Sequence, residues 1–254
     1  MATLITHSRV THAHMQEFLS DLVISITATA EQFASSTHYK HIYKTSLASF
    51  AALKILGRRQ LPLVKNAAES ARRIAVLIAC RQTTQASVEM RRFIELIVWF
   101  PYFSEHSVEW SEFTENPWTG FLKYDDNPIA FNAHREFSFY VSYIRERSKC
   151  GASSALALAL ADLSIAYADT SRSVHAAPLP SHGKQPLGAV DDFDDARLKE
   201  FAEMHRTTAA AGLSVVAWSR ADALQQLPAV ERGLFDWLLG KKSANAARAG
   251  KLSA

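Results

Sequence analysis

The chain has 254 residues, of which 48% are hydrophobic and 21% are charged. This is the composition of a globular protein, and it excludes global disorder. Nine glycines and eight prolines are few for this length, which disfavours the many tight turns of an all-β fold. Because 28 basic residues nearly balance 25 acidic ones, the net charge is only +3, and any nucleic-acid surface has to be a local patch.

Apolar residues recur at helical spacing along nearly the whole chain, which predicts an all-α fold. The first helix is expected over residues 12–33, where one stripe of apolar positions marks a face that packs on a core. This stripe consists of Met15, Leu19, Leu22, Ile26, Ala30 and Phe33. A second helix is expected over residues 37–56. A third is expected from Pro62 onward, because proline suits the first turn of a helix.

Residues 87–100 are apolar almost all round, so this helix is expected at the centre of the bundle. Pro101 is expected to kink or end it, because an internal proline removes a hydrogen bond and its ring clashes with the preceding turn. Helical spacing resumes over residues 102–113. Two further helices are expected over residues 132–149 and 153–174.

The clearest boundary is the Pro/Gly-rich run of residues 177–193, which is typical of a loop or linker. It separates a helical bundle core, residues 1–176, from C-terminal helices over residues 194–240. Residues 241–254 are small and basic, and a flexible tail is expected there. The sequence therefore predicts an all-α helical bundle with a C-terminal helical extension.

Several common chemistries have no counterpart in the sequence. There is no phosphate-binding glycine loop and no His-Glu-x-x-His motif, and none of the ten histidines has a glutamate three residues before it. Two histidine groups (His7, His12, His14 and His38, His41) lack the further ligands of a metal site, and we interpret them as incidental. Glu105 and Glu109 beside His106 are interpreted as a solvated face. No metal and no cofactor are expected.

The compartment is inferred from the cysteines and the N-terminus. Cys80 and Cys150 form no CxxC pair and suit a reducing cytosol. The first residues lack the basic and apolar regions of a secretory signal. The most apolar run, residues 93–103, is too short to span a bilayer. We therefore expect a cytoplasmic protein that does not contact a membrane.

Two charged residues stand out on the most apolar helix. Arg91 and Glu95 are four residues apart and can pair directly on one helix face, next to Arg92. A charge buried in the interior has to be paired, because an isolated one is very costly. One interpretation is a structural ion pair that locks two helices. The other is that the pair orients Ser171 or His175 on a neighbouring helix.

The end of the helix over residues 153–174 carries the densest set of chemical groups. Ser171 and His175 are four residues apart, and Arg172 and His175 are three apart, so they can converge on one phosphate. Histidine can move a proton near neutrality, and arginine can hold a phosphate or offset developing charge. These groups suit metal-free RNA cleavage, in which the 2′-hydroxyl attacks the adjacent phosphate. The alternative is a helix C-terminus where Arg172 and His175 only satisfy the last carbonyls.

These residues give the chain a resemblance to the HEPN superfamily, the helical domains common in prokaryotic toxin–antitoxin and antiviral defence systems. It resembles branches in which an Arg-x-x-x-Glu helix, here residues 91–95, precedes a helix ending in Tyr-x-x-x-Ser-x-x-Val-His, here residues 167–175. The resemblance covers about residues 40–176 and implies an up-down bundle. The family's ribonuclease signature separates arginine from histidine by more residues than the two between Arg172 and His175.

The resemblance implies two hypotheses for function. In the first, the protein acts on RNA, as a homodimer, with Arg172 and His175 catalytic and with Arg91, Arg92, Glu95 and Ser171 in support. In the second, it is a non-enzymatic helical module that binds a partner protein or nucleic acid in a defence or toxin–antitoxin complex. In that case the polar cluster is structural.

Overall fold

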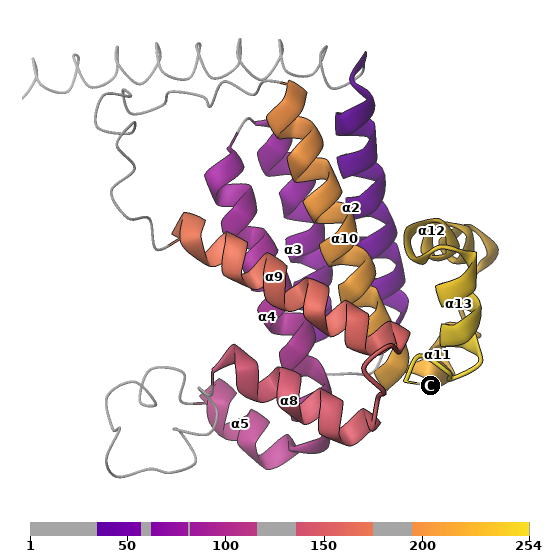
Figure 1. Ribbon diagram of the computed structural model, residues 1–254. Coiled ribbons are helices and arrows are strands. Elements are labelled where there is room, and N and C mark those ends of the chain that lie inside the picture. Colours follow the sequence, from indigo (N-terminus) through magenta and orange to yellow (C-terminus); the bar gives the residue numbers. More distant parts are fainter. Residues whose placement is uncertain (1–34, 57–61, 81, 116–135, 175–194, 254) are drawn as a thin grey trace, which may run out of the picture.

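The computed structural model describes residues 35–56, 62–80, 82–115, 136–174 and 195–253. Within these ranges the chain forms ten helices and no strand, which confirms the expected all-α bundle (Figure 1). The helix expected over residues 12–33 and the linker expected over residues 177–193 lie outside the described residues. None of the described helices is both long and apolar enough to cross a membrane.

Two long helices, α2 (Thr37–Leu56) and α3 (Pro62–Ala79), begin where the sequence predicts. Each turns one face inward. On α3 a ridge of small and branched residues is buried, namely Ala67, Ala71, Ile74 and Ile78. Small side chains let neighbouring backbones approach, and α3 packs against both α2 and α4 (Thr83–Glu105).

Helix α4 does not end at Pro101, so of the two alternatives expected there, a kink or an end, the end is wrong. It continues to Glu105, and α5 (Ser107–Glu115) follows. Phe100 and Phe103 on either side are fully buried, and the ring of Tyr102 meets the Tyr140 ring edge-on at 5.4 Å. Burial of these aromatic rings offsets the roughly 3 kcal/mol that an internal proline costs a helix.

The next two helices are α8 (Phe137–Ser148) and α9 (Ala155–Val174). Lys149 follows α8 with a left-handed backbone (φ 50°), which ends the helix. Ser154 precedes α9, and its Oγ accepts a hydrogen bond from the Ala157 N–H at 3.2 Å, so it caps that helix. Helix α9 packs against α4 and α10 through its buried leucines Leu156, Leu160 and Leu163.

Helix α10 (Asp195–Ser219), the first of the expected C-terminal helices, packs into the bundle core. It packs against α2, α9 and α4 (Figure 1). Its second half is almost fully buried, and at Gly212 it comes so close to α4 that an added Cβ would lie 2.8 Å from the Phe93 ring. The bundle therefore needs residues from both sides of the Pro/Gly-rich run.

Three short helices complete the described chain: α11 (Ala221–Leu224), α12 (Ala229–Leu239) and α13 (Lys241–Arg248). The expected flexible tail is therefore wrong for residues 241–253. Leu252 is buried, and its carbonyl accepts a hydrogen bond from the Leu156 N–H at 2.9 Å. Arg248 also forms an ion pair with Asp236 on α12. Ala244 and Ala247 on α13 are buried. Their small side chains let this helix pack closely, although most of its residues are polar.

Candidate functional site

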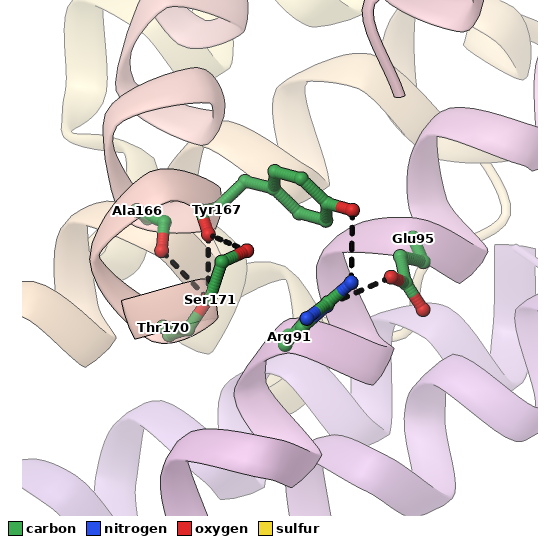
Figure 2. A network of polar contacts seen from close by, with 6 residues as sticks. All are labelled: Arg91, Glu95, Ala166, Tyr167, Thr170 and Ser171. Atoms are coloured by element: carbon green, nitrogen blue, oxygen red, sulfur yellow. Dashed lines mark hydrogen bonds and ion pairs between the residues drawn. The ribbon is translucent and has the colours of Figure 1, made fainter. Parts of the chain in front are cut away.

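The candidate site lies where α4 meets α9, and Arg91 is its central residue (Figure 2). The Arg91 Nε donates to the Glu95 carboxylate at 3.0 Å. Its Nη2 donates to the Tyr167 hydroxyl at 3.1 Å. The guanidinium carbon also lies 5.0 Å from the centroid of the Tyr167 ring, within the range of a cation–π contact. The predicted pair of Arg91 and Glu95 is present, and Tyr167 connects it to α9.

Tyr167 is held from a third helix as well. Its ring stacks on that of Phe137 at the start of α8, with centroids 4.1 Å apart and planes within 4° of parallel. The hydroxyl is thus fixed by α4 while the ring is fixed by α8. Neither partner is near Tyr167 in the sequence, so the helical periodicity of α9 alone contains no signal for these contacts.

The Arg91–Glu95 pair is sheltered from solvent but not enclosed. The two side chains are 19% and 26% exposed. Partial burial lowers the pKa of Arg91, but the hydrogen bonds and charges of Glu95 and Tyr167 outweigh it and leave this pKa above its ordinary value. Arg91 therefore remains a cation that its neighbours hold in one position.

Ser171 lies one turn further along α9 and bonds within its own helix. Its hydroxyl donates to the carbonyl oxygen of Tyr167 at 2.6 Å. The Thr170 hydroxyl does the same to the Ala166 carbonyl at 2.8 Å. Such bonds to the preceding turn are common for serine and threonine inside helices. As Figure 2 shows, the Ser171 hydroxyl is directed to the α9 backbone.

Arg92, the neighbour of Arg91, belongs to a different group on the α3 side of α4. Its Nη1 lies 3.9 Å from the Glu89 Oε1, and the Nη1 of Arg73 on α3 lies 3.5 Å from the same oxygen. The second Glu89 oxygen is buried without a hydrogen-bond partner among the described residues. Arg92 therefore contributes to an ion-pair cluster between α3 and α4, and the structure does not bring it together with Arg91.

The two residues predicted to be catalytic, Arg172 and His175, follow Ser171 in the sequence. Helix α9 continues through Val174, so the backbone of Arg172 belongs to its last turn. The side chain of Arg172 and the whole of His175 lie outside the described residues. The structure describes the part of α9 that precedes them, which the hydrogen bond between Arg91 and Tyr167 connects to α4.

A second polar group joins α4 to α8 and includes Glu105, which the sequence predicts to lie on a solvated face with Glu109. Glu105 accepts a hydrogen bond from the Tyr143 hydroxyl at 2.7 Å and another from the Arg147 Nε at 3.0 Å. The bond from Tyr143 lowers the pKa of Glu105, with Arg147 adding to it against partial burial. Burial, followed by the bond to Glu105, raises the pKa of Tyr143 to about 12. These groups form a tie between helices, and Tyr143 and Arg147 had no signal in the sequence.

The histidines and acidic residues that the structure describes form no cluster of three or more that could hold a metal ion. His38 instead lies 3.5 Å from Asp195 at the start of α10. His205 is fully enclosed in the core, and burial lowers its pKa to about 3. It is therefore a neutral core residue at physiological pH.

Comparison with known proteins found no match among family models, curated proteins or solved structures.

Proposed function

We propose that the protein is a HEPN-like metal-independent endoribonuclease of a prokaryotic defence or toxin–antitoxin system. The observation that supports this best is the 3.1 Å hydrogen bond from Arg91 to Tyr167, which holds the last turns of α9 against α4. Arg172 lies in this last turn, and His175 follows one residue after the helix. A catalytic pair needs such a rigid base, because small displacements of reacting groups cost much of the rate.

The proposed reaction uses the RNA's own 2′-hydroxyl as the nucleophile. His175 accepts the proton of this hydroxyl as it attacks the adjacent phosphorus, and a protonated histidine returns a proton to the departing 5′-oxygen. Arg172 holds the phosphate and offsets the charge that builds up on its oxygens. In a homodimer, the two copies of His175 would supply the base and the acid.

A second candidate function, a non-enzymatic module that binds RNA or a partner protein, is favoured by a separate observation. The supporting residues all have structural partners: Arg91 bonds Glu95 and Tyr167, Ser171 bonds its own helix, and Arg92 faces Glu89. Each of these contacts is made within the bundle and needs no substrate. On this account Arg172 is a contact residue rather than a catalyst.

The experiment that separates the two functions is cleavage of labelled RNA by the purified chain in EDTA. Arg172→Ala and His175→Ala are compared with Arg145→Ala and His41→Ala, which remove exposed residues of the same types on α8 and α2. The nuclease proposal expects cleavage by wild type and both controls, and a loss of about 100-fold or more in the two test variants. Equal cleavage by all four variants would contradict the assignment of Arg172 and His175.

If the wild-type chain cleaves no RNA, the same samples test the second candidate by gel shift. The binding module expects a shifted RNA band for wild type, His175→Ala and both controls, and a weaker shift for Arg172→Ala. If RNA is not shifted by any of them, RNA binding is rejected and a partner protein is left as the target.

A further inference from the structure

Helices α2 and α3 leave an apolar groove on the outside of the bundle. It has a volume of about 390 Å³. Four residues of each helix line it: Tyr43, Ser46, Leu47 and Phe50 from α2, and Arg72, Ala75, Val76 and Ala79 from α3. Tyr43, Leu47 and Val76 are 54%, 41% and 55% exposed, respectively. Neighbouring apolar side chains that remain open to water in this way mark a surface that another element covers.

We propose that residues 12–33 of this chain pack into this groove as a further helix of the bundle. The segment has the matching pattern, because Leu19, Leu22 and Ile26 fall on one face at spacings of three and four. It ends three residues before α2 begins at Thr37. A connection of this length is typical of two antiparallel helices that pack side by side.

The register of such a pair follows from the short connection. If Phe33 lies beside the start of α2, then Ile26 comes level with Tyr43 and Leu22 with Leu47. The span from Leu19 to Ile26 equals the span from Tyr43 to Phe50, about 10 Å at 1.5 Å per residue. The apolar stripe of the segment therefore matches the length of the groove.

The charges of the two surfaces also complement each other. Residues 12–33 contain Glu17, Asp21 and Glu31 and no lysine or arginine. In the same register Asp21 lies level with Ala48, next to the groove-lining Leu47, and Arg72 lines the same groove from α3. Glu31 lies level with His38, two residues before the exposed Lys40. Arg72 pairs with Glu69 at 3.0 Å, and its side chain is 62% exposed, which leaves the guanidinium accessible to a further acidic neighbour.

The same groove could accept a second copy of the chain or a separate protein, but the connection favours the chain's own segment. A helix tethered by three residues has a high effective concentration at the groove. A free partner would therefore need high affinity to displace it. The proposal does not depend on the function proposed above, since neither the groove nor residues 12–33 include a residue proposed to act on RNA.

Disulfide formation in the full chain tests the proposal. Leu22→Cys and Leu47→Cys are combined in a background in which Cys80 and Cys150 are serine. The control pairs Leu22→Cys with Val230→Cys, an exposed position on α12. Docking predicts a disulfide within one chain for the first pair and none for the control. A disulfide between two chains would show that a second copy occupies the groove. The absence of any disulfide would show that residues 12–33 do not occupy it. Either result overturns the proposal.

A second measurement does not rely on a cross-link. In the same cysteine-free background, a Val76→Cys thiol should react with a labelling reagent about tenfold faster when Leu22→Asp is added, because the covering helix is released. Ile24→Asp is the matched control, since residue 24 lies nearly opposite the stripe on a helix of 100° per residue. Equal labelling in the two aspartate variants would contradict docking. Circular dichroism confirms that each variant retains its fold.

Discussion

Arg91 and Tyr167 are 76 residues apart in the sequence, yet the guanidinium of one donates to the hydroxyl of the other at 3.1 Å. This bond connects the central helix α4 to α9, whose end carries the residues proposed to act on RNA. Phe137 stacks on the ring of the same tyrosine. The geometry of the candidate site thus depends on one arginine that its neighbours hold in place.

A double-mutant cycle measures the strength of this connection. Tyr167→Phe keeps the ring and its stacking on Phe137 but removes the hydroxyl, while Arg91→Met keeps the length of the side chain but removes its charge. We expect a coupling free energy of about 1 kcal/mol from urea unfolding of the two single variants and the double variant. The cycle cancels the effect of leaving Glu95 unpaired. A coupling indistinguishable from zero would show that the bond does not hold α9.

The close approach of α10 to α4 leaves no room for a side chain at Gly212. A Cβ added there would lie 2.8 Å from the ring of Phe93, which is itself only 2% exposed, so the packing around the ring would have to shift. We expect Gly212→Ala to destabilise the fold by roughly 1–3 kcal/mol. Gly233→Ala on α12 is the matched control, because a Cβ there meets nothing within 4 Å. Alanine favours a helix interior, so this control should gain about 0.5–1 kcal/mol. A Gly212→Ala variant as stable as wild type would contradict the packing.

The tie between Tyr143 and Glu105 predicts a particular dependence of stability on pH. The pKa of Tyr143 is raised from 10.0 to about 12, so its contribution is present below pH 10 and is lost as the pH rises towards 12. The pKa of Glu105 is lowered from 4.5, so its contribution is present above pH 4.5 and is lost as the pH falls below it. Denaturant midpoints of wild type and Tyr143→Phe should therefore differ most near neutral pH and converge at both extremes. Ultraviolet titration should find one tyrosine with a pKa near 12, absent from the variant.

His205 predicts a second effect of acid on the fold. Burial lowers the pKa of this histidine from 6.5 to about 3, so its contribution to stability is present above pH 6.5 and is lost as the pH falls towards 3. His205→Leu removes the group that the core has to keep neutral. Its unfolding midpoint should fall less steeply over this range than that of wild type. Exposed His41→Leu should show the wild-type slope, and an equally steep fall in His205→Leu would contradict the account.

The helices could be predicted from the sequence wherever local signals agreed with the packing. The bounds of α2 and the start of α3 at Pro62 follow from apolar periodicity and from the preference of proline for a first turn. Helix α4 passes through Pro101 because buried neighbours compensate for it, and periodicity alone cannot weigh that tertiary contribution. Helix α13 contains no apolar residue larger than alanine, so its packing was missed.

In the candidate site, only contacts between residues close in sequence could be predicted. The spacing of Arg91 and Glu95 sufficed for their pairing, since residues four apart face each other on a helix. The role of Tyr167 as their partner depends on how α4 and α9 cross, which no local pattern encodes. Arg92 and Glu89 are three residues apart, so the same spacing rule would have indicated their pairing, whereas the approach of Arg73 depends on how α3 packs against α4.

The most direct measurement of the central claim is cleavage in EDTA of two labelled RNAs that differ only by a 2′-deoxy sugar at the cleaved position. The account predicts that wild type cleaves the all-ribose RNA to a cyclic phosphate end, that it leaves the deoxy substrate intact, and that His175→Ala cleaves neither. Cleavage of both substrates, or cleavage by His175→Ala at the wild-type rate, would contradict it.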